Sequence, residues 1–140
     1  MKPYASLIVP PEDLALFTKI ERIVQEMPEV ELGKDGKGEK ILVSCHTLVR
    51  ALARFFPVEC QDGHFGNCEH SWLITRTGLI IDPCPVAVVG GPILVDTRFM
   101  PSWLSLYEKY SLPKLKGVRF LKNVDKVTEV VRQTMVRLEI

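Results

Sequence analysis

The chain has 140 residues, of which 46% are hydrophobic and 25% are charged. This composition is typical of a folded domain and excludes a mainly disordered chain. Lys and Arg number 18 against 17 Asp and Glu, a net charge of +1, which excludes the basic surface of a general nucleic-acid binder. Because no apolar run approaches a membrane helix and no signal peptide is present, we expect a single cytoplasmic domain over residues 1–140, with no nucleic acid and no membrane among its partners.

The first half of the chain predicts two helices. One begins after Pro10 and ends before Pro28, since apolar residues recur at helical spacing between them. The glycine-rich stretch 33–40 is predicted to be a solvated loop, because it lacks the Gly-Lys-Ser/Thr ending of a phosphate-binding loop. The second helix is predicted to begin at Cys45 with Ser44 as its N-cap. The apolar spacing predicts that the Cys45 sulfur faces the protein body at the positive end of this helix.

A β-hairpin is predicted to follow. Its strands cover residues 68–75 and 79–82, and they are joined by a three-residue loop that ends in Gly78. Such a loop commonly combines a type I turn with a left-handed glycine. This loop length puts His70 and Asp82 on the same face of the sheet as diagonal neighbours, whereas a two-residue loop would separate them.

The rest of the chain predicts short elements and one long helix. Residues 86–96 are interpreted as a turn flanked by extended pieces, 101–110 as a short amphipathic helix and 118–121 as an edge strand. Asn123 is predicted to cap the final helix. We therefore expect an α+β fold in which an antiparallel sheet packs against the helix that begins at Cys45, with the terminal helices outside.

The main functional signal is a concentration of sulfur and imidazole groups. All cysteines and histidines of the chain lie in one stretch: Cys45, His46, Cys60, His64, Cys68, His70 and Cys84. In a cytoplasmic protein the thiols are expected to be reduced. A thiol at a helix N-terminus has a lowered pKa, an imidazole within reach can pair with the thiolate, and a carboxylate can orient that imidazole. Cys45, His70 and Asp82 supply these three parts of a cysteine-nucleophile site.

This arrangement resembles the transglutaminase-like branch of the papain-like cysteine enzyme superfamily. The resemblance is carried by Ser44-Cys45-His46, His70-Ser71-Trp72 and Asp82-Pro83, within residues 41–85. It implies a papain-like or transglutaminase-like core and amide or thioester chemistry through an acyl-enzyme, as in peptidases, transglutaminases and deamidases. Cys45 would be the nucleophile, His70 the base and Asp82 its orienting partner. That chemistry needs no cofactor.

The surroundings of the nucleophile differ from the papain pattern. Residues 38–41 contain no Gln to complete an oxyanion hole, and the residue after the nucleophile is His46. The backbone N–H of Cys45 can supply one oxyanion donor. Trp72 and His46 are candidate substrate-binding residues, and Arg50 is interpreted as part of a solvated helix face. Because a short chain leaves little material for a deep cleft, a protein or peptide substrate is expected, while the oligomeric state stays open.

Two alternative functions compete with this prediction. Cys60, His64, Cys68 and His70 supply four soft ligands in eleven residues, and zinc favours a tetrahedron of such groups. A zinc-stabilised binding module would therefore use His70 as a ligand instead of a base. The other alternative is a catalytically silent relative that keeps the fold and binds a protein partner.

Overall fold

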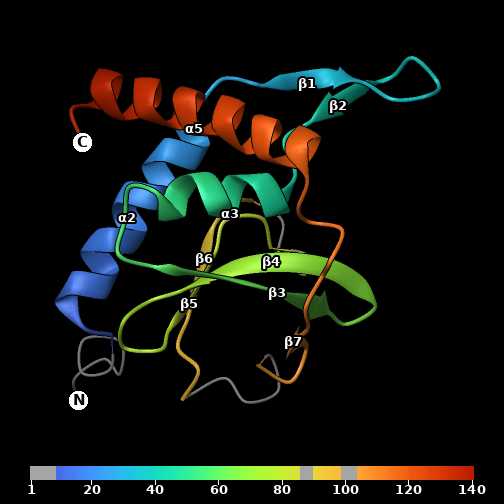
Figure 1. The fold of residues 1–140 in the computed structure, drawn as a ribbon. Helices are drawn as coiled ribbons and strands as arrows, with labels where there is room; N and C mark the ends of the chain where they lie inside the picture. The colour runs from blue at the N-terminus through green and yellow to red at the C-terminus, as the bar shows by residue number, and fades with distance from the viewer. Residues whose placement is uncertain (1–8, 86–89, 99–103) are drawn as a thin grey trace.

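The fold is described here from a computed structural model that covers residues 9–85, 90–98 and 104–140 (Figure 1). Its class is α+β, as predicted. The helices are α2 (Pro11–Glu26), α3 (Cys45–Ala53) and α5 (Val118–Leu138), and the strands are β1 (Glu31–Lys34), β2 (Lys40–Leu42), β3 (Glu59–Phe65), β4 (Cys68–Ile74), β5 (Ile80–Asp82), β6 (Ile93–Val95) and β7 (Tyr107–Lys109). In the part of the chain so described, none of the helices combines the length and the apolar character needed to span a bilayer.

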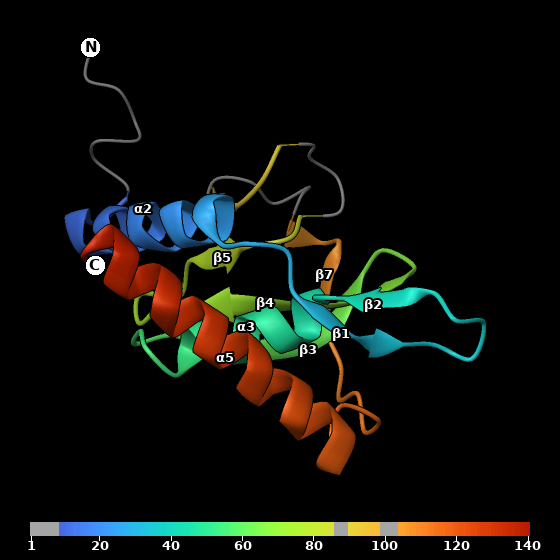
Figure 2. The same ribbon diagram turned by 90° about the horizontal axis from the view of Figure 1, so that it is seen from above.

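The central feature is a five-stranded antiparallel sheet with the strand order β6-β5-β4-β3-β7. Strands β1 and β2 form a separate hairpin. Helix α3 lies over the sheet, and α5 crosses α3 on the side away from the sheet (Figures 1 and 2). This layering places the N-terminus of α3 above β4, where the candidate nucleophile is held.

Apolar side chains form a cluster on each face of the sheet. The cluster under the helices contains Leu73 of β4 together with buried residues of α2, α3 and α5. The other contains Phe65, Trp72, Ile80, Val95 and Tyr107. Neighbouring residues of a strand point to opposite faces, so Trp72 and Leu73 belong to different clusters.

The β4–β5 hairpin has the predicted register. Leu73 lies opposite Ile81, which aligns Trp72 with Asp82. The Thr75 N–H donates to the Leu79 carbonyl at 2.9 Å, and the Gly78 N–H donates to the Thr75 carbonyl at 3.0 Å. Gly78 has φ of +90°, the left-handed conformation that glycine adopts at little cost. The prediction from the loop length is therefore confirmed.

The first two helices also agree with the sequence. Helix α2 begins at Pro11 and ends before Pro28, and α3 begins at Cys45. The Ser44 hydroxyl accepts a hydrogen bond from the Thr47 N–H at 3.3 Å, which confirms the predicted N-cap. These boundaries fix the position of Cys45 in the first turn of α3.

Several predictions for the other segments are wrong. Residues 118–121 are helical, and α5 begins after Gly117, so Asn123 lies inside the helix rather than at its cap. Residues 118–121 have only a weak preference for a strand, and the helix that continues from them determines their conformation. Residues 107–109 form a strand instead of a helix because they pair with the edge of β3. Residues 101–103 of that predicted helix lie outside the described part. The predicted loop over residues 33–40 is a loop only in its middle, since residues 33 and 34 belong to β1 and residue 40 belongs to β2.

Candidate active site

Cys45 is the first residue of α3 and is half-buried. The N–H groups in the first turn of a helix lack intrahelical acceptors, and their dipoles favour negative charge nearby. The Ser44 side chain occupies the Thr47 N–H. The backbone therefore offers the Cys45 sulfur a position that stabilises a thiolate, as the sequence predicted.

His70 and Asp82 form a buried pair on neighbouring strands. Nε2 of His70 lies 2.7 Å from Oδ2 of Asp82, and their side chains are 2% and 0% exposed. The Asp82 carboxylate also accepts hydrogen bonds from the Tyr107 hydroxyl at 2.8 Å and from the Cys84 N–H at 3.1 Å. Because Nε2 is engaged by Asp82, Nδ1 is the nitrogen of His70 that remains for the thiol.

The electrostatics of Cys45 and His70 favour a thiolate–imidazolium pair. Burial by itself raises the pKa of the Cys45 thiol, but hydrogen bonds with His46, His70 and the Ser71 backbone outweigh burial and lower the pKa to about 6. Burial also opposes the charged form of His70, but hydrogen bonds with Asp82 and Cys45 and their negative charges raise its pKa to about 9. At neutral pH the charged forms of both groups are therefore favoured.

Cys60 and Cys84 have the opposite electrostatics. Burial raises the pKa of Cys60 to about 11. Burial and the nearby charges of Cys45 and Asp82 raise that of Cys84 to about 12. Cys68 is exposed on the surface, and all four cysteines are free thiols. Burial alone therefore does not activate a thiol in this protein; the imidazoles around Cys45 do.

A second hydrogen-bonded chain approaches Cys45 from the face of the sheet that α3 covers. Nδ1 of His46 lies 2.6 Å from Oγ of Ser71, which donates to Oδ1 of Asp62 at 2.6 Å. Arg50 binds both oxygens of Asp62, at 3.0 and 2.6 Å. The interpretation of Arg50 as a solvated residue is thus wrong, since its side chain is 22% exposed and packs over Phe120.

No protein-family model, curated protein or solved structure matches this chain. The choice of a function therefore rests on the geometry of the site.

Trp72 does not have the substrate-binding position that the sequence suggested. It is 1% exposed and lies on the face of the sheet away from α3, where its ring packs edge-on against Tyr107. It also stacks on His70, with 6.0 Å between ring centroids. Among the described residues its indole N–H has no hydrogen-bond partner. Trp72 therefore supports the His70 side of the site from the core, and His46 is the one of the two candidates that contacts Cys45.

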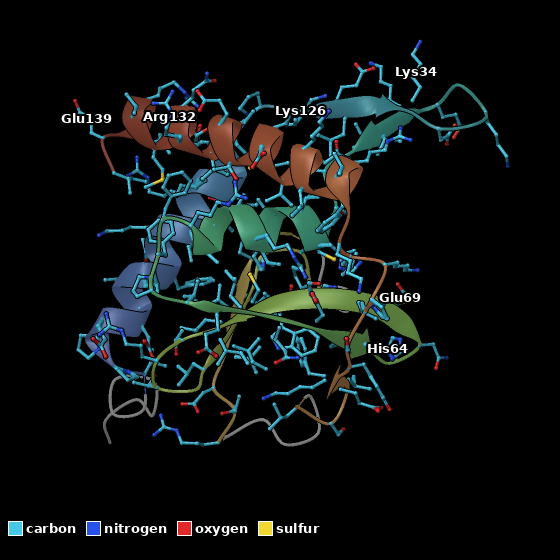
Figure 3. The ribbon with its side chains drawn as sticks, in the orientation of Figure 1. Lys34, His64, Glu69, Lys126, Arg132 and Glu139 are labelled. Atoms are coloured by element: carbon cyan, nitrogen blue, oxygen red, sulfur yellow. The ribbon has the colours of Figure 1, made fainter. Side chains whose placement is uncertain are left out.

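The residues of the alternative zinc site are not brought together. The β3–β4 register places Cys60 opposite Leu73, so Cys60 and His70 lie on different faces of the sheet. The Cys60 thiol donates to the Val49 carbonyl, and His64 lies at the far end of β3 (Figure 3) against Tyr110. Within the described residues no group of three or more His, Cys, Asp or Glu side chains could hold a metal. The structure therefore does not gather the four residues of the alternative zinc site into one cluster.

An apolar hollow of about 240 Å³ lies along the N-terminal end of α3. Its lining includes Met27, Val30, Leu42, Val43, Leu48 and Cys84. Val43 and Leu48 flank Cys45 in the sequence, and the pKa of Cys84 is raised partly by the charge of Cys45. The hollow therefore lies near the start of α3, although Cys45 is not among its lining residues, and it can accept an apolar group. Sequence reasoning did not find it, because its residues come from four separate segments.

Proposed function

We propose that this protein is a cysteine-nucleophile hydrolase or acyltransferase of the papain-like and transglutaminase-like type, acting on amide or thioester bonds. The observation that carries the proposal is the helix-starting thiol of Cys45, whose pKa is lowered to about 6. It interacts with His70, which is hydrogen-bonded to the buried Asp82. A thiolate paired with an oriented imidazolium is the resting state of a cysteine nucleophile.

The proposed reaction begins with attack of the Cys45 thiolate on the substrate carbonyl carbon. The Cys45 N–H at the start of α3 donates to the developing oxyanion. His70 gives its proton to the leaving amine as the carbon–nitrogen bond breaks, and an acyl-enzyme thioester remains. Asp82 holds His70 in the required orientation. Water or an amine then attacks the thioester carbonyl carbon while the neutral His70 takes its proton, and the carbon–sulfur bond breaks, which restores the Cys45 thiolate and the His70 imidazolium.

The substrate that fits this surface is a protein or peptide segment with an apolar group beside the reacting carbonyl. The hollow near the start of α3 is open and largely apolar, and such a site favours an extended chain that lays one side chain into it. This specificity is part of the proposal. Leu42 lines the hollow and is 49% exposed, so Leu42→Asp is expected to weaken the reaction of apolar peptide substrates more than that of a small activated ester without burying a charge in the core.

The proposal is tested by the pH dependence of alkylation of Cys45 with iodoacetamide, followed for each cysteine by mass spectrometry. The midpoint is expected near pH 6 in the wild-type protein and is expected to move toward 9 in His70→Ala, because the imidazolium partner is lost. The midpoint is the quantity to measure. Even a pKa that rose the whole way to 9 would lower the thiolate fraction at pH 7 from about 90% to about 1% while making each thiolate about 20-fold more nucleophilic, so the rate at a single pH would change only about fivefold.

His64→Ala is the matched control, because His64 stacks on Tyr110 and is not among the groups that shift the pKa of Cys45. Cys60 and Cys84, with pKa values raised to about 11 and about 12, are internal controls that should resist alkylation. A Cys45 midpoint near 9 in the wild-type protein would contradict the proposal. That result would favour the catalytically silent relative that binds a protein partner.

A further inference from the structure

The chain that leads from β7 into α5 carries a local excess of positive charge. Residues 114–122 include no Asp or Glu but contain four cations: Lys114, Lys116, Arg119 and Lys122. Lys114 is paired with Glu69 at 2.9 Å. The other three side chains are exposed, and none of them has an acidic partner among the described residues. The net charge of +1 for the whole chain therefore conceals a strongly basic region.

Two large apolar side chains lie among these cations and are also exposed. Val118 is 72% exposed and Leu121 is 52% exposed. The apolar pair and the three unpaired cations are together named the basic patch: Lys116, Val118, Arg119, Leu121 and Lys122. Exposed surface that combines apolar groups with charge of one sign is typical of a site for another molecule.

The basic patch works against the stability of α5. Arg119 and Lys122 lie in the first two turns, where the N–H groups already carry partial positive charge and acids are favoured. The first turn of α5 contains no acid, and its N-cap, Gly117, makes no side-chain hydrogen bond. In α2, by contrast, Glu12 and Asp13 occupy the first turn. Because local features that oppose folding are expected mainly at functional sites, the charge of the patch indicates a function.

The basic patch is held beside the start of α3 on both of its sides. On one side, the ion pair of Lys114 with Glu69 links the chain before the patch to β4. On the other, the ring of Phe120 lies 5.3 Å from the guanidinium of Arg50, in the second turn of α3. Figure 1 shows the first turn of α5 and the start of α3 at the same end of the molecule. A chain that reacts at Cys45 can therefore extend onto the patch.

We propose that the basic patch binds an acidic segment of the protein or peptide substrate while the reacting carbonyl lies at Cys45. This specificity rests on the proposed function of Cys45 and names the class of its substrate. The substrate is a chain with Asp or Glu residues and an intervening apolar residue near the bond that reacts. The cations attract such a segment before contact and orient it, while Val118 and Leu121 cover its apolar residue. An anionic membrane would also attract the cations, but the position of the patch beside the nucleophile favours the substrate.

Acylation of Cys45 by peptide thioesters, followed by mass spectrometry, tests this inference. One thioester carries the acetylated acyl chain Asp-Val-Glu-Leu, and its partner carries Ser-Val-Ser-Leu. A second pair carries the acidic and the serine segments on the leaving thiol, which covers both directions of the chain. The measured quantity is the ratio of the acidic to the serine rate within one protein, because this ratio cancels any change in the reactivity of the thiol itself. In at least one pair the wild-type ratio is expected to be about 10 at low salt.

Charge reversal on the patch should remove this preference. In Arg119→Glu/Lys122→Glu the ratio is expected to fall to about 1 or below. Lys19→Glu/Arg22→Glu is the matched control and should keep the wild-type ratio. It makes the same change in net charge at two exposed positions of α2, which lies toward the end of α3 away from Cys45 (Figures 1 and 2). Val118→Ser should lower the ratio by a smaller factor if both serine segments keep their valine.

Salt dependence gives an independent measurement. Exposed charges are screened by salt, so the wild-type ratio is expected to shrink as NaCl rises from about 20 mM to about 300 mM. The ratio in Arg119→Glu/Lys122→Glu should not shrink in this way. A wild-type preference that is insensitive to salt would overturn the inference, because it would not come from the charge of the patch.

The outcomes distinguish the inference from the function on which it rests. If S-phenyl thioacetate, a small thioester that does not reach the patch, acylates wild-type Cys45 no faster than Cys68, the proposed function itself fails. If Cys45 is acylated and both ratios equal 1, only the inference fails. Equal losses in the patch variant and the α2 control would show an effect of net charge and would also overturn it. Patch-dependent sedimentation with phosphatidylglycerol vesicles, without a preference for acidic thioesters, would assign the patch to a membrane surface instead.

Discussion

Replacement of Cys45 by Ala is expected to change how the free energy of unfolding depends on pH. In the folded protein the pKa of His70 is raised from 6.5 to about 9. This group stabilises the fold fully below pH 6.5, and its contribution is lost as pH rises through 9. The pKa of Cys45 is lowered from 9.0 to about 6. Its contribution is fully present above pH 9 and is lost as pH falls through 6.

The two contributions cancel in the wild-type protein. From pH 6.5 to 8.5 the contribution of His70 falls by about 2 kcal/mol while that of Cys45 rises by about 2 kcal/mol. The same result follows from counting protons, since the folded pair holds one proton on His70 and the unfolded chain holds one on Cys45. We therefore expect the wild-type free energy of unfolding to be nearly constant over this range, as far as this pair determines it.

Cys45→Ala removes the contribution of Cys45 and leaves the pH-dependent contribution of His70 uncompensated. Its free energy of unfolding is expected to fall from pH 6.5 to 8.5 by up to about 2 kcal/mol. The loss is smaller to the extent that the Cys45 charge itself supports the raised pKa of His70. Urea unfolding followed by tryptophan fluorescence at several pH values measures this slope. Cys60→Ala is the control, because the pKa of Cys60 is raised to about 11 and its removal should leave the slope unchanged.

Two results would refute this reasoning. A wild-type protein that loses about 2 kcal/mol between pH 6.5 and 8.5 would show that Cys45 is not an anion in the folded state. A Cys45→Ala protein as insensitive to pH as the wild type would show that His70 is not held protonated by Asp82.

Two stability predictions concern the surroundings of the pair. Tyr107→Phe removes the 2.8 Å hydrogen bond to the buried Asp82 carboxylate, and urea unfolding should show a free energy of unfolding lower by about 1.5–3 kcal/mol. Tyr110→Phe is the control, because its hydroxyl makes only an exposed 3.2 Å contact with Glu108, and it should change the free energy of unfolding little. Equal effects of the two substitutions would contradict the reasoning. Gly63→Ala places a Cβ against the Glu108 carbonyl and the Trp72 ring and should cost at least about 3 kcal/mol, whereas Gly36→Ala meets open space and should retain wild-type stability.

The part of the site that depends on local signals could be predicted from the sequence. Ser44 is a strong N-cap residue, so the start of α3 and the place of Cys45 follow from a few neighbouring residues. Gly78 determines the loop of the β4–β5 hairpin, and the loop determines that His70 and Asp82 share a face. Each of these steps depends on residues close together in the chain.

The parts that were missed depend on contacts between distant segments. Tyr107 reaches Asp82 because β7 pairs with β3 at the edge of the sheet. No local sequence pattern predicts that pairing. Asp62 precedes a glycine and therefore has the composition of a turn, but it lies in the middle of β3. Gly63 is required there because the Glu108 backbone and Trp72 approach closely, not because the chain turns. Because an Asp-Gly pair is typical of a turn, the sequence gives no sign that Asp62 is linked to His46 through Ser71.

The difference between the half-buried Asp62 and the buried Asp82 explains why the pair of His70 and Asp82 belongs to the fold and not only to catalysis. An ionised carboxylate is costly to bury unless a cation or several donors compensate it. Asp62 is compensated by Arg50. Asp82 is 0% exposed, and its cationic partner among the described residues is His70, with Tyr107 and the Cys84 N–H as further donors. An ionised Asp82 therefore holds the proton on His70 whether or not a thiolate is present. The imidazolium is in place before Cys45 loses its proton, and hydrogen bonds from His46, His70 and the Ser71 backbone together make that loss favourable near pH 6.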